Sequence, residues 1–88
     1  MRVRFDPAKA AANLKAHGVS FEEAEAVLFD PMAVTAEDPD TLGERRFITV
    51  GRADSGRLLV AVFTEREGEY RLISARRPTR KERKSYEG

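Results

Sequence analysis

Arginine is concentrated in the second half of the chain, and it is the side chain best suited to grip phosphate. Positions 45–88 hold twelve lysines and arginines against six aspartates and glutamates, whereas positions 1–44 hold four against nine. Ten of the twelve are arginine. A guanidinium group binds phosphate through planar, paired hydrogen bonds that an ammonium cannot make. The second half is therefore suited to a polyanion, most plausibly nucleic acid, although a solvated, ion-paired surface has the same composition.

Four further side chains offer acid–base or stacking chemistry. His17 is the single histidine, and it could carry a proton or bind phosphate, or could complement the dipole at a helix end. Lys9 precedes it by about two helical turns and so shares its face. Glu44 immediately precedes two arginines, and it could act as a base or as their ion-pair partner. Tyr86 could stack on a base or anchor the last helix.

Cleavage of RNA needs little more than these residue types. The 2′-hydroxyl attacks the adjacent phosphate through a pentacoordinate state with extra negative charge. Arginine and lysine stabilise that charge while a histidine, glutamate or tyrosine moves the proton. Since stabilisation by cations can dominate, a weak general base does not exclude activity. The residues are compatible with cleavage without demonstrating it.

Length and composition narrow the class of protein. A chain of 88 residues has room for one domain, expected to span residues 1–88. Without cysteine it forms no disulfide, and one histidine excludes the usual structural zinc sites, so we expect no metal and no cofactor; composition alone leaves carboxylate-bound magnesium open. No apolar run approaches the roughly 20 residues that span a bilayer, and the N-terminus lacks a signal-peptide core. We therefore expect a cytoplasmic protein with no membrane contact.

The elements that must position these side chains change period from helical to strand-like along the chain. A short strand opens it, and Asp6 caps a helix over residues 8–17 that ends at Gly18. Ser20 and Glu23 predict a reciprocal capping box at the start of a second helix, which Pro31 stops. Further elements are expected as strands at residues 32–36, 46–52, 58–64 and 70–76 and as a Thr79-capped helix at residues 80–86. The predicted fold is α+β, with helices packed on one face of an antiparallel meander whose central strand is 58–64.

The turn at Glu67-Gly68 sets the register of the last hairpin. A two-residue loop there pairs residue 66 with 69, 64 with 71 and 62 with 73. Arg66 and Arg76 then lie on opposite faces, at opposite ends of the hairpin, and a one-residue bulge would change that relation.

Three blocks of the sequence resemble the BrnT family of toxins from bacterial type II toxin–antitoxin pairs. The first is Phe5-Asp6-Pro7-Ala8-Lys9, Asn13 and Lys15-Ala16-His17-Gly18-Val19-Ser20-Phe21-Glu22-Glu23-Ala24. The second is Glu44-Arg45-Arg46-Phe47-Ile48-Thr49-Val50-Gly51. The third comprises Thr64, Arg66, Ile73-Ser74-Ala75-Arg76, Glu82 and Tyr86.

The resemblance implies a RelE-like fold, with two N-terminal helices on the meander and a C-terminal helix. It also implies metal-independent RNA cleavage that inhibits translation. The implied partner is a BrnA-like ribbon-helix-helix antitoxin in a two-plus-two complex that reaches operator DNA through the antitoxin. Candidate catalytic residues are Arg66, Arg76, His17 and Glu44. Candidate RNA-binding residues are Lys9, Arg45, Arg71, Arg77 and Tyr86.

Two other classes of function stay open at this point. The chain could be a non-catalytic nucleic-acid-binding or corepressor module, whose affinity would fall steeply with salt. It could also be a structural interaction protein that docks a partner through its acidic half or an exposed sheet face.

Overall fold

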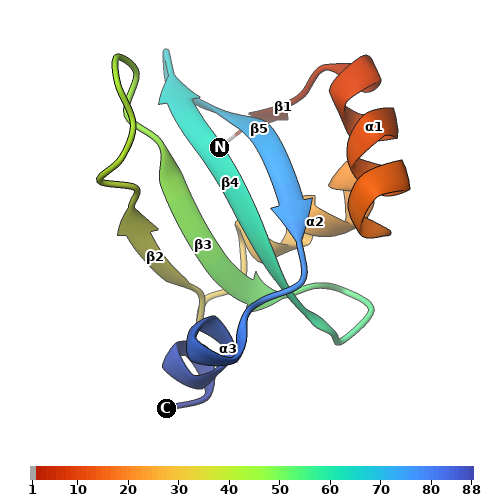
Figure 1. The fold of residues 1–88 in the computed structure, drawn as a ribbon, viewed down its shortest axis with the longest axis vertical. Helices are drawn as coiled ribbons and strands as arrows, with labels where there is room; N and C mark the ends of the chain where they lie inside the picture. The colour runs from red at the N-terminus through yellow and green to blue at the C-terminus, as the bar shows by residue number, and fades with distance from the viewer. Residues whose placement is uncertain (1) are drawn as a thin grey trace.

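A computed structural model describes residues 2–88 as five strands and three helices (Figure 1). In chain order they are β1 (Arg2–Arg4), α1 (Pro7–His17), α2 (Phe21–Val27), β2 (Val34–Glu37), β3 (Phe47–Arg52), β4 (Leu58–Arg66), β5 (Glu69–Arg76) and α3 (Arg80–Glu87). Every element that the periodicity predicts is present. Among the residues that the structure describes, no helix is long and apolar enough to cross a membrane.

The strands form one sheet in the order β1-β5-β4-β3-β2. Strands β2 to β5 pair antiparallel with their neighbours, which confirms the predicted meander with β4 at its centre. Strand β1 adds a parallel edge to β5, with Val3 opposite Tyr70, so the sheet is mixed rather than purely antiparallel. The N-terminal arginines of β1 thereby come to lie beside the β4–β5 hairpin.

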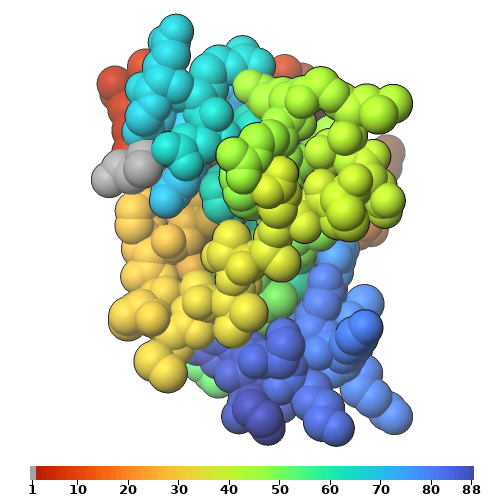
Figure 2. All heavy atoms as spheres, turned by 90° about the vertical axis from the view of Figure 1, so that its left-hand side faces the viewer, coloured from red at the N-terminus to blue at the C-terminus, as the bar shows by residue number. Residues whose placement is uncertain are grey.

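The helices lie on both sides of the sheet, so the expectation of helices on one face is wrong. Helix α2 covers one face, where its Phe21 and Val27 join Leu59, Phe63 and Leu72 in the main core; we call this the core face. Helix α1 flanks the edge of β5, and α3 lies on the side opposite α2 (Figures 1 and 2). The C-terminal helix therefore helps to bury the second face, where Val60 is fully buried.

Helix caps explain where the helices start and stop. Asp6 accepts a hydrogen bond from the Ala8 amide, and Gly18 ends α1 with φ of 68°, a left-handed conformation that favours glycine. Ser20 accepts from the Glu23 amide, as predicted. The reciprocal half of that box is absent because the Glu23 carboxylate accepts hydrogen bonds from the Arg57 guanidinium instead, at 2.6 and 2.8 Å. An ion pair with the loop between β3 and β4 outcompetes the local cap.

A β-bulge changes the register of the β4–β5 hairpin. The predicted pairs Arg66↔Glu69 and Thr64↔Arg71 are present, but Val62 pairs with Ser74 rather than with residue 73. The register shift between Val62 and Phe63 leaves Ile73 as the extra residue of β5. Beyond the bulge, each side chain of β5 points to the face opposite the one that the predicted register gives it. Arg76 and Arg66 therefore lie on the same face. We call this second face, which carries Val60, Val62, Thr64 and Arg66 of β4, the arginine face.

The side chain of Asn13 fixes the edge of β5 just beyond this bulge. Its amide nitrogen donates to the Ala75 carbonyl at 2.8 Å and to the Val19 carbonyl at 3.0 Å. Its carbonyl oxygen accepts from the Ala75 amide at 3.1 Å. Asn13 is buried, and it pairs with β5 as a neighbouring strand would, beyond the point where β1 ends. One side chain thus joins α1, the start of α2 and the sheet.

We predict that Asn13→Ala lowers the free energy of unfolding by about 2–4 kcal/mol, because it leaves the buried backbone groups of Ala75 without partners. Urea denaturation followed by circular dichroism measures the change. Lys15→Ala, an exposed position on the same helix, is the control and should stay within about 0.5 kcal/mol of wild type. Equal stability of the two variants would contradict the structural role of Asn13.

Candidate nucleic-acid interface

Four side chains gather on the arginine face at the tip of the β4–β5 hairpin. Thr64 and Arg66 point to this face from alternate positions of β4, and Arg71 lies directly opposite Thr64 on β5. Glu44 reaches them from the loop before β3, which lies at the same end of the molecule as the hairpin (Figures 1 and 2). It accepts two hydrogen bonds from the Arg66 guanidinium, at 2.9 and 3.0 Å. We call this group the hairpin cluster.

The hairpin cluster holds Glu44 in its charged form. Hydrogen bonds from Arg66 lower the pKa of the Glu44 carboxyl, and Thr64 and Arg71 lower it further. The same contact raises the pKa of Arg66. A carboxylate in such a field is ionised at neutral pH and is a weak base for as long as Arg66 stays bound to it.

Thr64 contributes a buried hydroxyl that lies close enough to Glu44 to lower the pKa of that carboxyl. The residue is only 4% exposed, and its Oγ1 makes no hydrogen bond of good geometry within residues 2–88. A buried hydroxyl without a partner costs free energy, and such groups persist where another molecule can satisfy them. It lies among the charged groups of the hairpin cluster, which is a polar environment suited to a phosphate oxygen.

Further arginines enlarge the positive field around the cluster. Arg4 of β1 lies in register with Arg71 and donates to Glu69 at 2.8 Å, while Arg2 approaches the same carboxylate at 3.7 Å. Arg71 is exposed and makes no ion pair with any residue that the structure describes. Four arginines thus meet two carboxylates at this end of the sheet, and Arg71 is the guanidinium that is free to bind a phosphate.

Arg76 shares the face of Arg66 but lies at the other end of the sheet. It pairs with Val60, six residues before Arg66 on β4, which places the two arginines about 20 Å apart. Its guanidinium binds both oxygens of Glu82, at 2.7 and 2.9 Å, and the two side chains are only 32% and 23% exposed. Glu82 also completes the capping box of Thr79 at the start of α3. Arg76 therefore ties α3 to β5, and the structure does not bring it together with Arg66.

The helix candidates lie apart from the hairpin cluster. Lys9 and His17 are both exposed on α1, His17 as its last residue. Within the described part of the chain, His17 makes no hydrogen bond or ion pair with Glu44, Arg66 or Arg76. Its imidazole is placed to complement the dipole at the end of α1, which is one of the two roles that the sequence allowed.

The other predicted RNA-binding residues have varied surroundings. Arg45 binds both oxygens of Glu37, and its guanidinium lies 5.4 Å from the centre of the Phe47 ring. Arg77 is exposed between β5 and α3. The Tyr86 hydroxyl donates to Asp30 at 2.7 Å, which raises the pKa of Tyr86, and Arg52 lies over its ring. Tyr86 thus anchors α3, the second role considered for it.

Sequence reasoning missed two members of the site. The predicted register puts Thr64 on one face with Arg66 and Arg71, but its residue type alone does not mark it as a site residue. Arg4 was overlooked because the parallel pairing of β1 with β5 leaves no local signal in the sequence. No group of three or more His, Asp or Glu side chains suited to a metal ion occurs within residues 2–88.

Comparison with known proteins decides the family. A family model described as "Ribonuclease toxin, BrnT, of type II toxin-antitoxin system" matches residues 5–82. The chain belongs to the BrnT family. No curated protein matches it. Among solved structures, the 1.1 Å crystal structure of the Brucella abortus ribonuclease toxin BrnT is similar, with 20% sequence identity and a TM-score of 0.66. The match covers 91% of this chain and 99% of that one.

Membership settles the broad function and the structural match settles the fold. As a BrnT toxin, the chain is the toxin component of a type II toxin–antitoxin system, and an antitoxin partner follows from that class. The structural likeness, at 20% identity, confirms the BrnT-type α+β fold that the resemblance implied. The hairpin cluster lies within the matched residues, since Glu44, Thr64, Arg66 and Arg71 all fall between 5 and 82.

We predict that the Arg76–Glu82 pair makes stability depend on pH in the acid range. Arg76 lowers the pKa of Glu82 from 4.5 to about 2. A carboxyl whose pKa is lower in the folded state stabilises the fold above its unfolded pKa, and this contribution is lost as the pH falls from about 5 towards 2. Urea denaturation at pH 6 and pH 3 should show a loss of about 2 kcal/mol from this pair. Glu82→Gln should flatten this part of the profile, whereas Glu87→Gln at the exposed end of α3 should leave it; equal profiles in all three proteins would contradict the assignment.

Proposed function

We propose that this BrnT toxin is an endoribonuclease that cleaves RNA at the hairpin cluster. The observation that carries the proposal is the free guanidinium of Arg71 opposite the buried, unpartnered hydroxyl of Thr64, beside an ionised Glu44 and a fixed Arg66. Two arginines, a hydroxyl donor and a carboxylate supply the functions that attack by a 2′-hydroxyl requires. The family description as ribonuclease toxins supports this reaction.

The reaction begins with the scissile phosphate between Arg71 and Arg66. Arg71 binds first because it has no carboxylate to release, and the Thr64 hydroxyl donates to a phosphate oxygen. The phosphate then competes with Glu44 for the Arg66 fork. As Arg66 turns to the phosphate, the main cause of the low pKa of Glu44 is removed, and its pKa rises towards the ordinary value. Glu44 thus becomes a better base when substrate is in place, and it takes the proton of the attacking 2′-hydroxyl. As the bond from the 2′-oxygen to phosphorus forms, the bond from phosphorus to the 5′-oxygen breaks. A 2′,3′-cyclic phosphate is left, and the departing 5′-oxygen takes a proton from solvent.

The guanidinium groups supply the larger part of the rate enhancement. The pentacoordinate state carries one more negative charge than the bound phosphodiester, so both arginines bind it more strongly than the substrate. Arg66 is held in place by strand β4 and by Glu44 before substrate arrives. Because Arg66 must leave Glu44 to reach the phosphate, its place on strand β4, and not the ion pair, positions it for the reaction.

The remaining parts of the proposal follow from the class of protein. We infer one toxin domain over residues 1–88, acting in the cytoplasm, where cleavage of RNA inhibits translation. A BrnA-like ribbon-helix-helix antitoxin neutralises it in a two-plus-two complex and carries the complex to operator DNA. Arg45, Arg77 and Lys9 are exposed cations that would contact the RNA backbone beyond the cluster, and the positions of Arg76, His17 and Tyr86 favour positioning roles.

We predict that Arg66→Ala and Arg71→Ala each lower RNA cleavage by about 100-fold or more, because each removes a cation from the transition state. Expression in cells should then restore growth. Arg66→Lys should not recover the activity, since an ammonium cannot replace the paired hydrogen bonds. Lys84→Ala on α3 is the control and should remain toxic. Unchanged cleavage by folded Arg66→Ala and Arg71→Ala would remove the hairpin cluster from the site.

Thr64→Val offers a second prediction, in which stability and activity separate. Valine has the shape of threonine without the unpartnered hydroxyl, so the free energy of unfolding should stay the same or rise by about 1 kcal/mol. Cleavage should fall by about tenfold or more as the donor to the phosphate is lost. Urea denaturation and cleavage of a defined RNA, on the same preparation, measure the two effects. A stable variant with full activity would show that Thr64 has no part in the reaction.

A non-catalytic binding module is the second candidate, and the Glu44–Arg66 pair is the observation that favours it. If Glu44 never releases Arg66, the cluster has one free guanidinium and binds phosphate without cleaving it. Binding of RNA and of operator DNA, measured at 50 and 200 mM salt, would then be steeply salt-dependent while the RNA stays intact. Cleavage products from the purified, antitoxin-free chain would rule this candidate out.

A further inference from the structure

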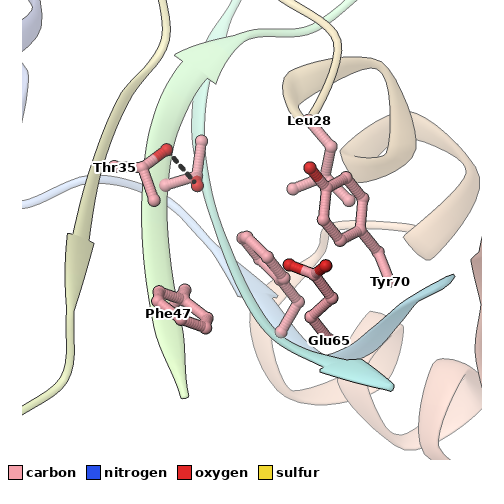
Figure 3. A pocket seen from close by; sticks show the side chains of 7 residues that line it. Leu28, Thr35, Phe47, Glu65 and Tyr70 are labelled. Carbon is pink, nitrogen blue, oxygen red and sulfur yellow. Dashed lines mark hydrogen bonds between the residues drawn. The ribbon is translucent and has the colours of Figure 1, made fainter. Parts of the chain in front are cut away.

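The core face carries a pocket that the cleavage chemistry does not use. Phe47 and Phe63 stack with ring centres 5.7 Å apart, and Tyr70 meets Phe63 edge-on at 4.8 Å. Phe63 is 6% exposed and forms the floor, while Phe47 and Tyr70 are half-buried walls. These rings enclose a hollow of about 210 Å³ with Leu28 at its edge, drawn in Figure 3. We call it the aromatic pocket.

The Glu65 carboxylate supplies the free hydrogen-bond acceptors of the aromatic pocket. The Glu65 carboxylate points into it between Phe47 and Tyr70 in the view of Figure 3, and it makes no hydrogen bond within the described residues. Thr35 and Thr49 satisfy each other at 2.8 Å. An ionised carboxylate only accepts hydrogen bonds, through two neighbouring oxygens. The pocket therefore requires a flat, apolar ligand with donors on one edge.

A nucleobase of single-stranded RNA meets these requirements, and guanine meets them best. Unstacked bases bind proteins by stacking on aromatic rings and by hydrogen bonds at their Watson–Crick edge. Guanine presents two adjacent donors on that edge, the ring N1–H and the exocyclic amino group, which match the two oxygens of a carboxylate. Uracil presents one N–H between two carbonyl oxygens that the carboxylate repels. The hollow is smaller than the roughly 300–1,000 Å³ of sites for drug-sized ligands, as a single base requires.

The aromatic pocket and the hairpin cluster lie on opposite faces of the sheet, at the same ends of β4 and β5. Glu65 stands between Thr64 and Arg66 on β4, and its partner Tyr70 precedes Arg71 on β5, so alternate residues serve opposite faces. Surface hollows connect the two sites. One hollow shares Phe47 and Glu65 with the pocket and reaches the hairpin tip at Glu67 and Gly68. The next shares Glu67 and reaches Arg66 and Arg71.

We propose that the aromatic pocket binds a guanine base of the RNA close to the cleaved phosphate, and so selects where the toxin cuts. This inference rests on the proposed ribonuclease function and adds substrate specificity to it. The carboxylates of Glu65 and Glu67 repel phosphate from the mouth of the pocket, so a base enters it while the backbone follows the arginine face. Arg45, which lies over Phe47, borders the same path.

Binding of mononucleotides tests the pocket without any cleavage. Nuclear magnetic resonance titration of the full chain with GMP, AMP, CMP and UMP compares four ligands that share one phosphate and differ in the base. GMP should shift the ring signals of Phe47 and Tyr70 and bind roughly tenfold or more tightly than UMP. Glu65→Gln should remove most of this preference, whereas Glu22→Gln, an exposed carboxylate on α2, should retain it. Equal affinities for all four ligands, or no shift at Phe47 and Tyr70, would overturn the proposal.

Mapping of cleavage sites separates this proposal from the ribonuclease function. With a mixed-sequence RNA, wild-type protein should cut at a constant offset from guanines, and Glu65→Gln should show about tenfold less preference for those positions. If the wild-type protein cuts RNA without regard to guanine, the proposal of guanine binding is wrong and the ribonuclease function is unaffected. If no protein cuts RNA at all, the ribonuclease function fails, and the GMP titration alone decides the pocket.

Discussion

The side-chain amide of Asn13 is the contact on which the arrangement of this protein depends. Strand β1 covers only the first part of β5, and the bulge at Ile73 interrupts the pairing with β4. Beyond that point the free edge of β5 is held by Asn13, through both the amide and the carbonyl of Ala75. At Ala75 a helix side chain, rather than a further strand, supplies the hydrogen bonds of this edge. The bulge turns Arg76 to the arginine face and lets α3 dock on the side opposite α2.

Acidic residues of the first half of the chain form ion pairs with arginines of the second half. Glu23, Glu37 and Glu44 belong to the acidic half, and each binds both nitrogens of an arginine of the basic half. These pairs join α2 to the loop between β3 and β4, β2 to the loop before β3, and that loop to β4. They also decide which cations remain available: Arg45, Arg57 and Arg66 are engaged, whereas Arg71 and Arg77 are not. Charge counted along the sequence therefore overstates the number of guanidinium groups free to bind a polyanion, and pairing narrows the site to a few positions.

Much of this fold follows from local signals, and the errors are all long-range. Asp6, Ser20 and Thr79 cap the helices as their side chains predict, and the Glu67-Gly68 turn sets the first pairs of the hairpin correctly. The bulge carries no local signal, and the hold of Asn13 on Ala75 joins residues 62 positions apart in the chain. The same holds for Glu23, whose role depends on Arg57, and for the parallel pairing of β1. Residue type alone points to Glu44, Arg66 and Arg71 as site residues. It cannot show that Arg76 and His17 lie away from them in the fold.

Strand alternation gives the hairpin tip its two chemically different sides. Thr64, Arg66 and Arg71 face one way and offer cations and a hydroxyl, whereas Glu65 and Tyr70 face the other and offer a carboxylate and an aromatic ring. A phosphodiester and a base have opposite requirements, since the first needs cations and the second needs stacking and hydrogen-bond acceptors without competing charge. Three consecutive residue pairs of one hairpin provide both. Because neighbouring residues serve different sides, a slip of one residue in the register would exchange the two surfaces, so the same pairing that stabilises the hairpin also fixes the division of chemistry across it.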